Sequence, residues 1–230
     1  REKDGVLIGC GADGHGEDGE LAGKRAAYVT PFLLKGRDLS SDTDRIEAME
    51  WAYEGAGDNV DMSVNDYAGT TLTTAMVDGD TVTVGNVGDS ELRSFNNEGD
   101  NISLVGVHDI QTNRFERERA VGQGAVMHKS YVMNTDGKGA AVSRAFGHRD
   151  VPGIVEKPDI NVYSKQQLGT KFMVLASDGF WERIDSSPNL KRDVAQLCTT
   201  SDTAEEFLKQ IQFILKIYQI YWDNITIAVF

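Results

Sequence analysis

The sequence predicts an α+β domain in which antiparallel sheets are covered by helices. Segments rich in threonine and valine follow one another closely between residues 69 and 95, as the strands of a meander do. Segments with helical spacing of apolar residues lie near both ends of the chain and do not alternate with those strands. Strands and helices that occupy separate parts of a chain are typical of this class.

The length and composition of the chain favour a single domain. With 230 residues, of which 40% are hydrophobic, the chain is long enough for one full-sized domain with a large core. The sequence contains no internal repeat, low-complexity segment or convincing linker. We therefore expect residues 1–230 to form one domain.

The first elements are a strand and two helices. Residues 5–12 are expected to form a buried strand that ends in a glycine-rich turn, followed by a helix over residues 20–34. A second helix is expected over residues 41–56, because Ser41 or Asp42 can cap its start and apolar residues recur on one face. These helices can cover one face of a sheet.

The middle of the chain favours strands. Residues 69–77 and 81–87 are joined by Asp78-Gly79-Asp80, which is typical of a hairpin, and residues 91–95 continue the meander. Residues 114–120 predict a short charged helix.

Two further strands and one helix complete the prediction. Buried strands are expected over residues 140–145 and 172–176. The most regular helix begins at Ser201 or Asp202, with Glu205 placed to complete a capping box with Asp202.

The charge and the cysteines exclude several classes of function. A formal net charge of −13 argues against binding to nucleic acid or to an anionic membrane surface, since both attract lysine and arginine. Cys10 and Cys198 do not make a disulfide framework. The longest apolar stretch, residues 211–222, is amphipathic and carries no signal of a membrane span. We expect an intracellular protein, either cytoplasmic or nuclear.

Three short acidic segments border apolar strands. They are Asp13-Gly14-His15-Gly16, Ser177-Asp178-Gly179 and Asp223-Asn224. Carboxylates at the ends of rigid strands can be held at fixed distances, as a cluster of hard divalent cations requires. Taken singly, each Asp-Gly pair is more typical of a plain turn.

The chemistry of these segments suits Mg²⁺ or Mn²⁺, which prefer carboxylates, carbonyls and water. Asp13 offers a carboxylate and Gly14 an unhindered carbonyl, while Asp178 and Asp223 can complete the shell. Two such ions can lower the pKa of a shared water and direct it at an electrophile. His15 could then donate a proton to a leaving alkoxide.

Several short motifs occur along the chain in the same order as in a known protein family. They are Asp13-Gly14-His15-Gly16, Gly69-Thr70-Thr71, Asn86-Val87-Gly88-Asp89-Ser90, Arg117-Glu118-Arg119, Ala141-Val142-Ser143-Arg144-Ala145-Phe146-Gly147, Lys157-Pro158-Asp159, Leu175-Ala176-Ser177-Asp178-Gly179-Phe180-Trp181 and Asp223-Asn224-Ile225-Thr226. In this order, and across nearly the whole chain, the sequence resembles the type 2C protein serine/threonine phosphatases, a metal-dependent family.

The resemblance implies a four-layer α-β-β-α sandwich with two central antiparallel sheets. It implies that Asp13 bridges two Mn²⁺ or Mg²⁺ ions, that Gly14 contributes its carbonyl, and that Asp178 and Asp223 complete one shell. A metal-bridging hydroxide would attack phosphoserine or phosphothreonine while His15 protonates the leaving oxygen. The implied partner is a phosphoprotein substrate, with a regulatory protein as a possible second partner, and we expect a monomer.

The sequence departs from the family pattern in several places, three of which bear on the site. The family's first strand, with a phosphate-binding arginine and a Glu-Asp pair for the second metal, would lie before Arg1. We expect either a longer natural chain or a protein without that strand. His148 stands after Phe146-Gly147, where the family usually has aspartate. The aspartate for a third metal falls on His108 by spacing, which leaves Asp109 one residue out of register as a candidate.

Three hypotheses about function follow. The first is an active metal-dependent phosphatase for phosphoserine and phosphothreonine on proteins. The second is a catalytically inactive phosphatase-like domain that serves as a binding scaffold or regulator, which the missing arginine favours and the retained ligands oppose. The third is a small-molecule phosphatase or another metal hydrolase on the same fold.

Overall fold

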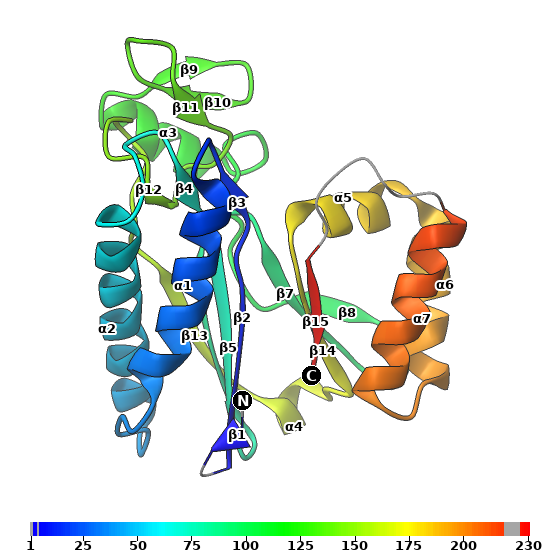
Figure 1. The fold of residues 1–230 in the computed structure, drawn as a ribbon. Helices are drawn as coiled ribbons and strands as arrows, with labels where there is room; N and C mark the ends of the chain where they lie inside the picture. Colours follow the sequence, from blue (N-terminus) through cyan, green and yellow to red (C-terminus); the bar gives the residue numbers. More distant parts are fainter. Residues whose placement is uncertain (1, 4, 219–225) are drawn as a thin grey trace.

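Two antiparallel sheets lie between layers of helices. The computed structural model describes residues 2–3, 5–218 and 226–230. Figure 1 shows α1 and α2 beside one sheet and α6 and α7 beside the other, with both sheets between them. This is the predicted four-layer arrangement.

The strands form two large and two small sheets. The five-stranded sheet has the order β1 (Glu2–Lys3), β2 (Val6–Gly11), β5 (Leu72–Asp78), β6 (Thr81–Val87) and β13 (Asp159–Ser164). The four-stranded sheet has the order β15 (Ile227–Val229), β14 (Phe172–Ala176), β7 (Glu91–Phe95) and β8 (Asn101–Ser103). One small sheet contains β12 (Phe146–Gly147), β4 (Gly69–Thr70) and β3 (Gly14–His15), and the other contains β11 (Gly139–Ala140), β10 (Tyr131–Met133) and β9 (Val126–His128).

The helices flank these sheets. They are α1 (Gly19–Leu34), α2 (Asp42–Asp61), α3 (Arg114–Gly122), α4 (Lys165–Leu168), α5 (Asp178–Ser186), α6 (Pro188–Thr200) and α7 (Ala204–Ile217). The predicted cap of α2 is confirmed, since the Ser41 side chain accepts a hydrogen bond from the Asp44 backbone and Asp44 reciprocates.

Strand β5 shows why both central sheets are buried on two faces. Leu72 and Met76 pack against the helices α1 and α2, whereas Ala75 and Val77 pack against the other sheet. Successive side chains of a strand point to opposite faces, so apolar residues at both parities bury both. Strand β14 divides in the same way between the helices α5–α7 and the space between the sheets.

Residues 140–145 do not form the strand that the sequence predicts. Strand β11 ends at Ala140, and beyond it the backbone makes only isolated bridges, Asp109 with Val142 and Arg144 with Val155. The Ser143 hydroxyl donates to Glu116 (2.6 Å), and the Arg144 guanidinium also binds Glu116. These side-chain contacts tie the segment to α3 and leave its backbone outside a sheet.

The last helix begins slightly later than predicted. Its N-cap is Thr203, whose hydroxyl accepts from the Glu206 backbone, so the proposed pairing of Asp202 with Glu205 is wrong by one position. None of the helices among the described residues is long and apolar enough to cross a membrane.

Candidate metal centre

The backbone of Asp13 is fixed between β2 and β3. Its N–H donates to the Thr71 hydroxyl (3.0 Å), and its carbonyl accepts from the Thr71 N–H (2.9 Å) and the Thr70 hydroxyl (3.0 Å). Both threonines lie at the junction of β4 and β5, where the small sheet meets the large one. The position of Asp13 is therefore set by strands remote in sequence.

Gly14 lies in close contact with the start of α1. A Cβ atom at Gly14 would stand 1.8 Å from the carbonyl oxygen of Gly19 and 2.3 Å from its carbonyl carbon. Only glycine fits this approach, because the obstructing atoms belong to backbone.

Asp178 occupies the first turn of α5, directly after the buried strand β14. The sequence predicts a turn here, but a helix starts instead, and the Gly179 N–H donates to the Asp178 carboxylate (2.7 Å). A carboxylate at a helix N-terminus is favoured by the helix dipole.

The last predicted ligand, Asp223, lies outside the described residues. Close to it in sequence, Thr226 accepts a hydrogen bond at its carbonyl from the Ser177 N–H (3.2 Å). The chain after residue 225 thus returns to the residue that precedes Asp178.

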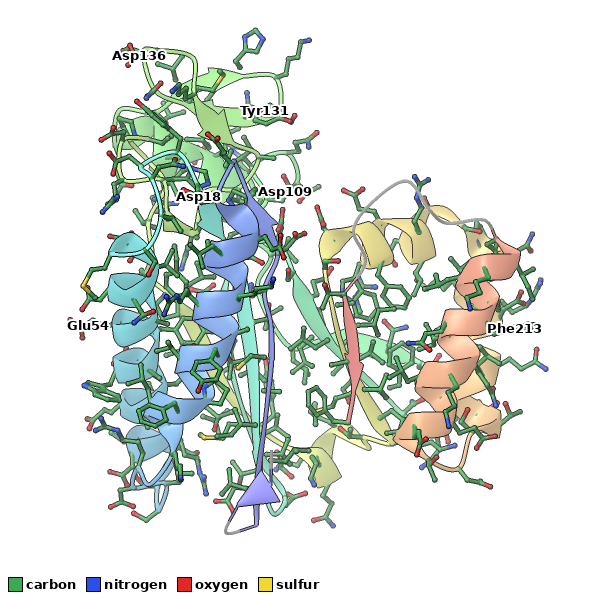
Figure 2. The ribbon with its side chains drawn as sticks, in the orientation of Figure 1. Asp18, Glu54, Asp109, Tyr131, Asp136 and Phe213 are labelled. Carbon is green, nitrogen blue, oxygen red and sulfur yellow. The ribbon has the colours of Figure 1, made fainter. Side chains whose placement is uncertain are left out.

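Asp89 reveals that several carboxylates converge. Burial raises the pKa of Asp89 to about 8, and the negative charges of Asp178, Asp13 and Asp109 add to this effect. These residues come from four separate segments of the chain, and Figure 2 shows Asp109 at the same end of the molecule as β3 and α5. We call Asp13, Asp89, Asp109 and Asp178 the acidic cluster.

Asp89 is not among the ligands that the sequence predicts. Asp89 lies in the Gly88-Asp89 turn after β6, which the sequence explains as a common turn. A signal was present, since the turn follows a buried strand, as Asp13 and Asp178 also do. The acidic cluster supplies hard oxygen ligands, which fit Mn²⁺ or Mg²⁺. Within the described ranges, however, no three acidic, histidine or cysteine side chains already have the spacing of a metal site.

Asp109 and His108 have different roles in the structure. The Asp109 carboxylate accepts from the Gln111 N–H (2.8 Å) and the Thr112 hydroxyl (2.8 Å). His108 is buried, and its Nδ1 accepts from the Gly88 N–H (3.0 Å) while its Nε2 pairs with Asp159 (3.0 Å). His108 therefore supports the turn that carries Asp89, and Asp109 belongs to the acidic cluster.

His15 follows this site in β3. Burial lowers the pKa of His15 to about 4, opposed by a hydrogen bond with the Asp13 backbone. Its ring stacks on the ring of His148, with centroids 4.6 Å apart and planes 13° from parallel. His148 was noted in the sequence only as a departure from the family pattern.

Two grooves border the loop from Asp13 to Gly16. One of about 620 Å³ lies between β2, α1 and Thr226 and reaches Asp13. The other, of about 650 Å³, lies between Gly16 and the sheet of β9–β11, where Tyr131 and Lys138 line it. Figure 2 shows Tyr131 beside that sheet.

Comparison with known proteins assigns the chain to a family. The family model described as protein phosphatase 2C matches residues 12–210. The chain belongs to the protein phosphatase 2C family. It is 28% identical over 221 residues to probable protein phosphatase 2C 73 of Arabidopsis thaliana, covering 78% of this chain and 58% of that protein. It is 34% identical over 190 residues to probable protein phosphatase 2C 71 of the same plant, covering 78% and 40%.

Similarity extends to an animal relative and to solved structures. Protein phosphatase 1L of Bos taurus is 26% identical over 219 residues, covering 94% of this chain and 55% of that protein. The chain thus spans about half the length of these relatives. A serine-threonine phosphatase 2C from Toxoplasma gondii superposes with a TM-score of 0.77 at 20% identity, over 99% of this chain and 85% of that one. At that identity the superposition shows the fold alone, and it confirms the predicted phosphatase 2C fold.

Proposed function

We propose that this member of the phosphatase 2C family is a metal-dependent protein serine/threonine phosphatase. The observation that carries the proposal is the convergence of the acidic cluster. Four carboxylates in a partly buried place repel one another, and a divalent cation would offset that repulsion. The family membership supports the same reading.

The proposed ligands are Asp13, Asp178 and Asp223, with the carbonyl of Gly14, for two Mn²⁺ or Mg²⁺ ions. Asp109 is a candidate for a third ion. When bound, the ions would supply Lewis acidity to the phosphate and lower the pKa of water. Asp13 is suited to this role because three hydrogen bonds fix its backbone.

His15 is proposed to hold the proton that the leaving oxygen of serine or threonine requires. Its Nε2 is shielded from solvent and makes no hydrogen bond among the described residues, so this atom is not committed to the scaffold. Although burial lowers the pKa of the ring, a bound phosphate would favour its charged form.

The substrate is proposed to be a phosphorylated segment of a protein. The net charge of −13 repels a phosphate, so affinity must arise locally from cations and from contacts with the rest of the substrate. The two grooves beside Asp13 and Gly16 offer space for residues on either side of a phosphoserine or phosphothreonine.

The test is the hydrolysis of a phosphothreonine peptide in Mn²⁺ and in EDTA. We expect turnover in Mn²⁺ alone, and we expect Asp178→Asn to abolish it. Asp202→Asn, at an exposed position before α7, is the matched control and should leave turnover unchanged. Turnover that persists in EDTA would contradict the proposal. Mn²⁺ binding without any turnover would instead favour the binding scaffold or regulator.

A further inference from the structure

The small sheet at the candidate site brings two histidines together. Its strands β12, β4 and β3 lie side by side near α1 (Figure 1). In this sheet His15 is paired with Gly69, and Gly69 is paired on its other side with Gly147. His148 follows Gly147 directly, so the sheet places both histidines beside Gly69.

Gly69 leaves the space that the ring of His148 occupies. A Cβ atom at Gly69 would stand 2.5 Å from Cδ2 and 2.8 Å from Nε2 of His148. The ring therefore lies over the bare backbone of β4, in the place of a side chain. From there its face meets the face of His15.

The backbone of His148 is held in an unusual conformation. Its φ is 53°, in the left-handed region that non-glycine residues rarely adopt. Two backbone hydrogen bonds maintain it, from the His148 N–H to Ala68 (3.1 Å) and from the Val151 N–H to His148 (2.9 Å). This unfavourable backbone conformation places the imidazole ring at this point.

Ordinary core packing does not account for this ring. His148 is 3% exposed, and neither of its nitrogens has a hydrogen-bond partner among the described residues. Burying unpaired polar nitrogens is unfavourable, and an aliphatic side chain would fill the same space at a lower cost. What the imidazole provides is a flat ring against His15.

We propose that His148 is a positioning residue, which holds the ring of His15 by stacking so that its Nε2 stays in one place during proton transfer. This inference rests on the proposed function. His15 has two rotatable side-chain bonds, and a proton donor must keep a fixed direction toward the leaving oxygen to be effective. The stacked ring restricts His15 without using its nitrogen.

Nuclear magnetic resonance tests the positioning itself. The chain has four histidines, so labelled imidazoles give a simple spectrum. His148→Asn removes the ring but tolerates a left-handed backbone, and it should shift and broaden the His15 ring signals. His128→Asn is the matched control at an exposed position and should leave them unchanged. His148→Phe, which restores a flat ring, should bring back narrow His15 signals. Unchanged His15 signals in His148→Asn would overturn the proposal.

Kinetics with two substrates separate positioning from a general structural role. A serine or threonine alkoxide needs a proton to leave, whereas p-nitrophenolate leaves without one. His148→Asn should lower kcat about tenfold for a phosphothreonine peptide, with KM unchanged, and should change turnover of p-nitrophenyl phosphate less than about twofold. The affinity for Mn²⁺, measured by calorimetry, should also stay unchanged.

The outcomes distinguish the inference from the function on which it rests. An equal loss on both substrates would indicate damage to the whole site and would overturn the positioning role. If the wild-type protein turns over neither substrate in Mn²⁺, the proposed function is wrong. The imidazole spectra then still decide whether His148 holds the His15 ring.

Discussion

Asp89 shows how single residues report the character of the site. Burial and the charges of its neighbours raise the pKa of its carboxyl group to about 8. A carboxyl group in such surroundings is unfavourable when ionised, so without a cation Asp89 destabilises the fold wherever it is ionised. A cation bound beside Asp89 would remove that cost.

Mn²⁺ should therefore raise the midpoint of thermal unfolding. An ion that binds only the folded state stabilises it by about 2.7 kcal/mol at a concentration of 100 times Kd. Asp178→Asn should lose most of that gain and, in EDTA, should be at least as stable as the wild type. Scanning calorimetry in Mn²⁺ and in EDTA measures both effects. Equal wild-type midpoints in the two buffers would exclude a metal site of useful affinity.

Gly14→Ala should destabilise the protein by about 3 kcal/mol, because its Cβ would overlap the backbone of Gly19. Gly122→Ala is the control, since a Cβ there meets no atom within 4 Å and lies in helix α3. That control should be neutral or stabilising by about 0.5 kcal/mol. Urea denaturation compares the two variants. A small effect at Gly14 would mean that α1 can move away from β3.

One buried carboxylate ties helix α3 to the neighbouring elements. Glu116 is 5% exposed, and it accepts hydrogen bonds from Ser143, Arg119 and Arg144. Arg144 also binds Asp159 of β13 (2.8 Å). The two ion pairs of Arg144 thus join a helix, a loop and a strand.

Glu116→Gln should destabilise the protein by about 3 kcal/mol at pH 7, because two arginines lose their buried counter-ion. Burial alone would raise the pKa of Glu116, but the hydrogen bonds and charges of these partners outweigh it and lower the pKa to about 2, from an ordinary value near 4.5. Its contribution is therefore present above pH 4.5 and is lost as the pH falls toward 2. Glu118→Gln, which breaks an exposed pair with Arg114 on the same helix, should change stability by less than about 1 kcal/mol. Equal effects of the two substitutions would refute the network's role.

The sequence predicts elements well where the pattern is local. The strands of the meander and the capped helix α2 follow from alternation and from Ser41. Helix α6 was missed although Ser187 caps it and Pro188 occupies its first turn, which is a readable signal. Strand β13 was missed because its residues are only partially buried and show no clear strand pattern by themselves. They form a strand by pairing with β6.

The site follows the same rule. The sequence proposes Asp13 and Asp178 as ligands because each follows a strand within a recognisable motif. Asp89 and His148 could not, since their significance depends on the approach of segments distant in sequence. No local pattern reports that a ring at position 148 will lie over Gly69 and meet His15.

The excess of acidic groups over the whole protein determines how its stability depends on pH. The formal net charge is −13 at pH 7, so ionised carboxylates repel one another over the whole surface. Glu156, which lies where α2 meets the segment after β12, adds a buried carboxylate to this repulsion. Burial raises its pKa to about 7, and the charge of Asp61 contributes.

Glu156→Gln should stabilise the protein at pH 8 and have little effect at pH 4.5. The pKa of Glu156 is about 7 in the folded state and near 4.5 when unfolded, so the folded state holds its proton more tightly. The contribution of Glu156 to the free energy of unfolding is therefore fully present below pH 4.5, and it is lost as the pH rises through 7. Gln can still accept the hydrogen bond from the Gly147 N–H (3.0 Å), and the gain at pH 8 should be about 2 kcal/mol after allowance for solvent.

The matched control for this change is Glu54→Gln, at an exposed position on α2 (Figure 2). This substitution also removes one carboxylate charge close to α2, but from an exposed position and not from a buried one. Urea denaturation at pH 4.5, 6 and 8 should therefore show a gain that still rises between pH 6 and 8 for Glu156→Gln, whereas any gain for Glu54→Gln should be small and nearly equal at pH 6 and 8. If both variants gain equally at pH 8, the global charge and not the burial of Glu156 governs the loss of stability above neutral pH.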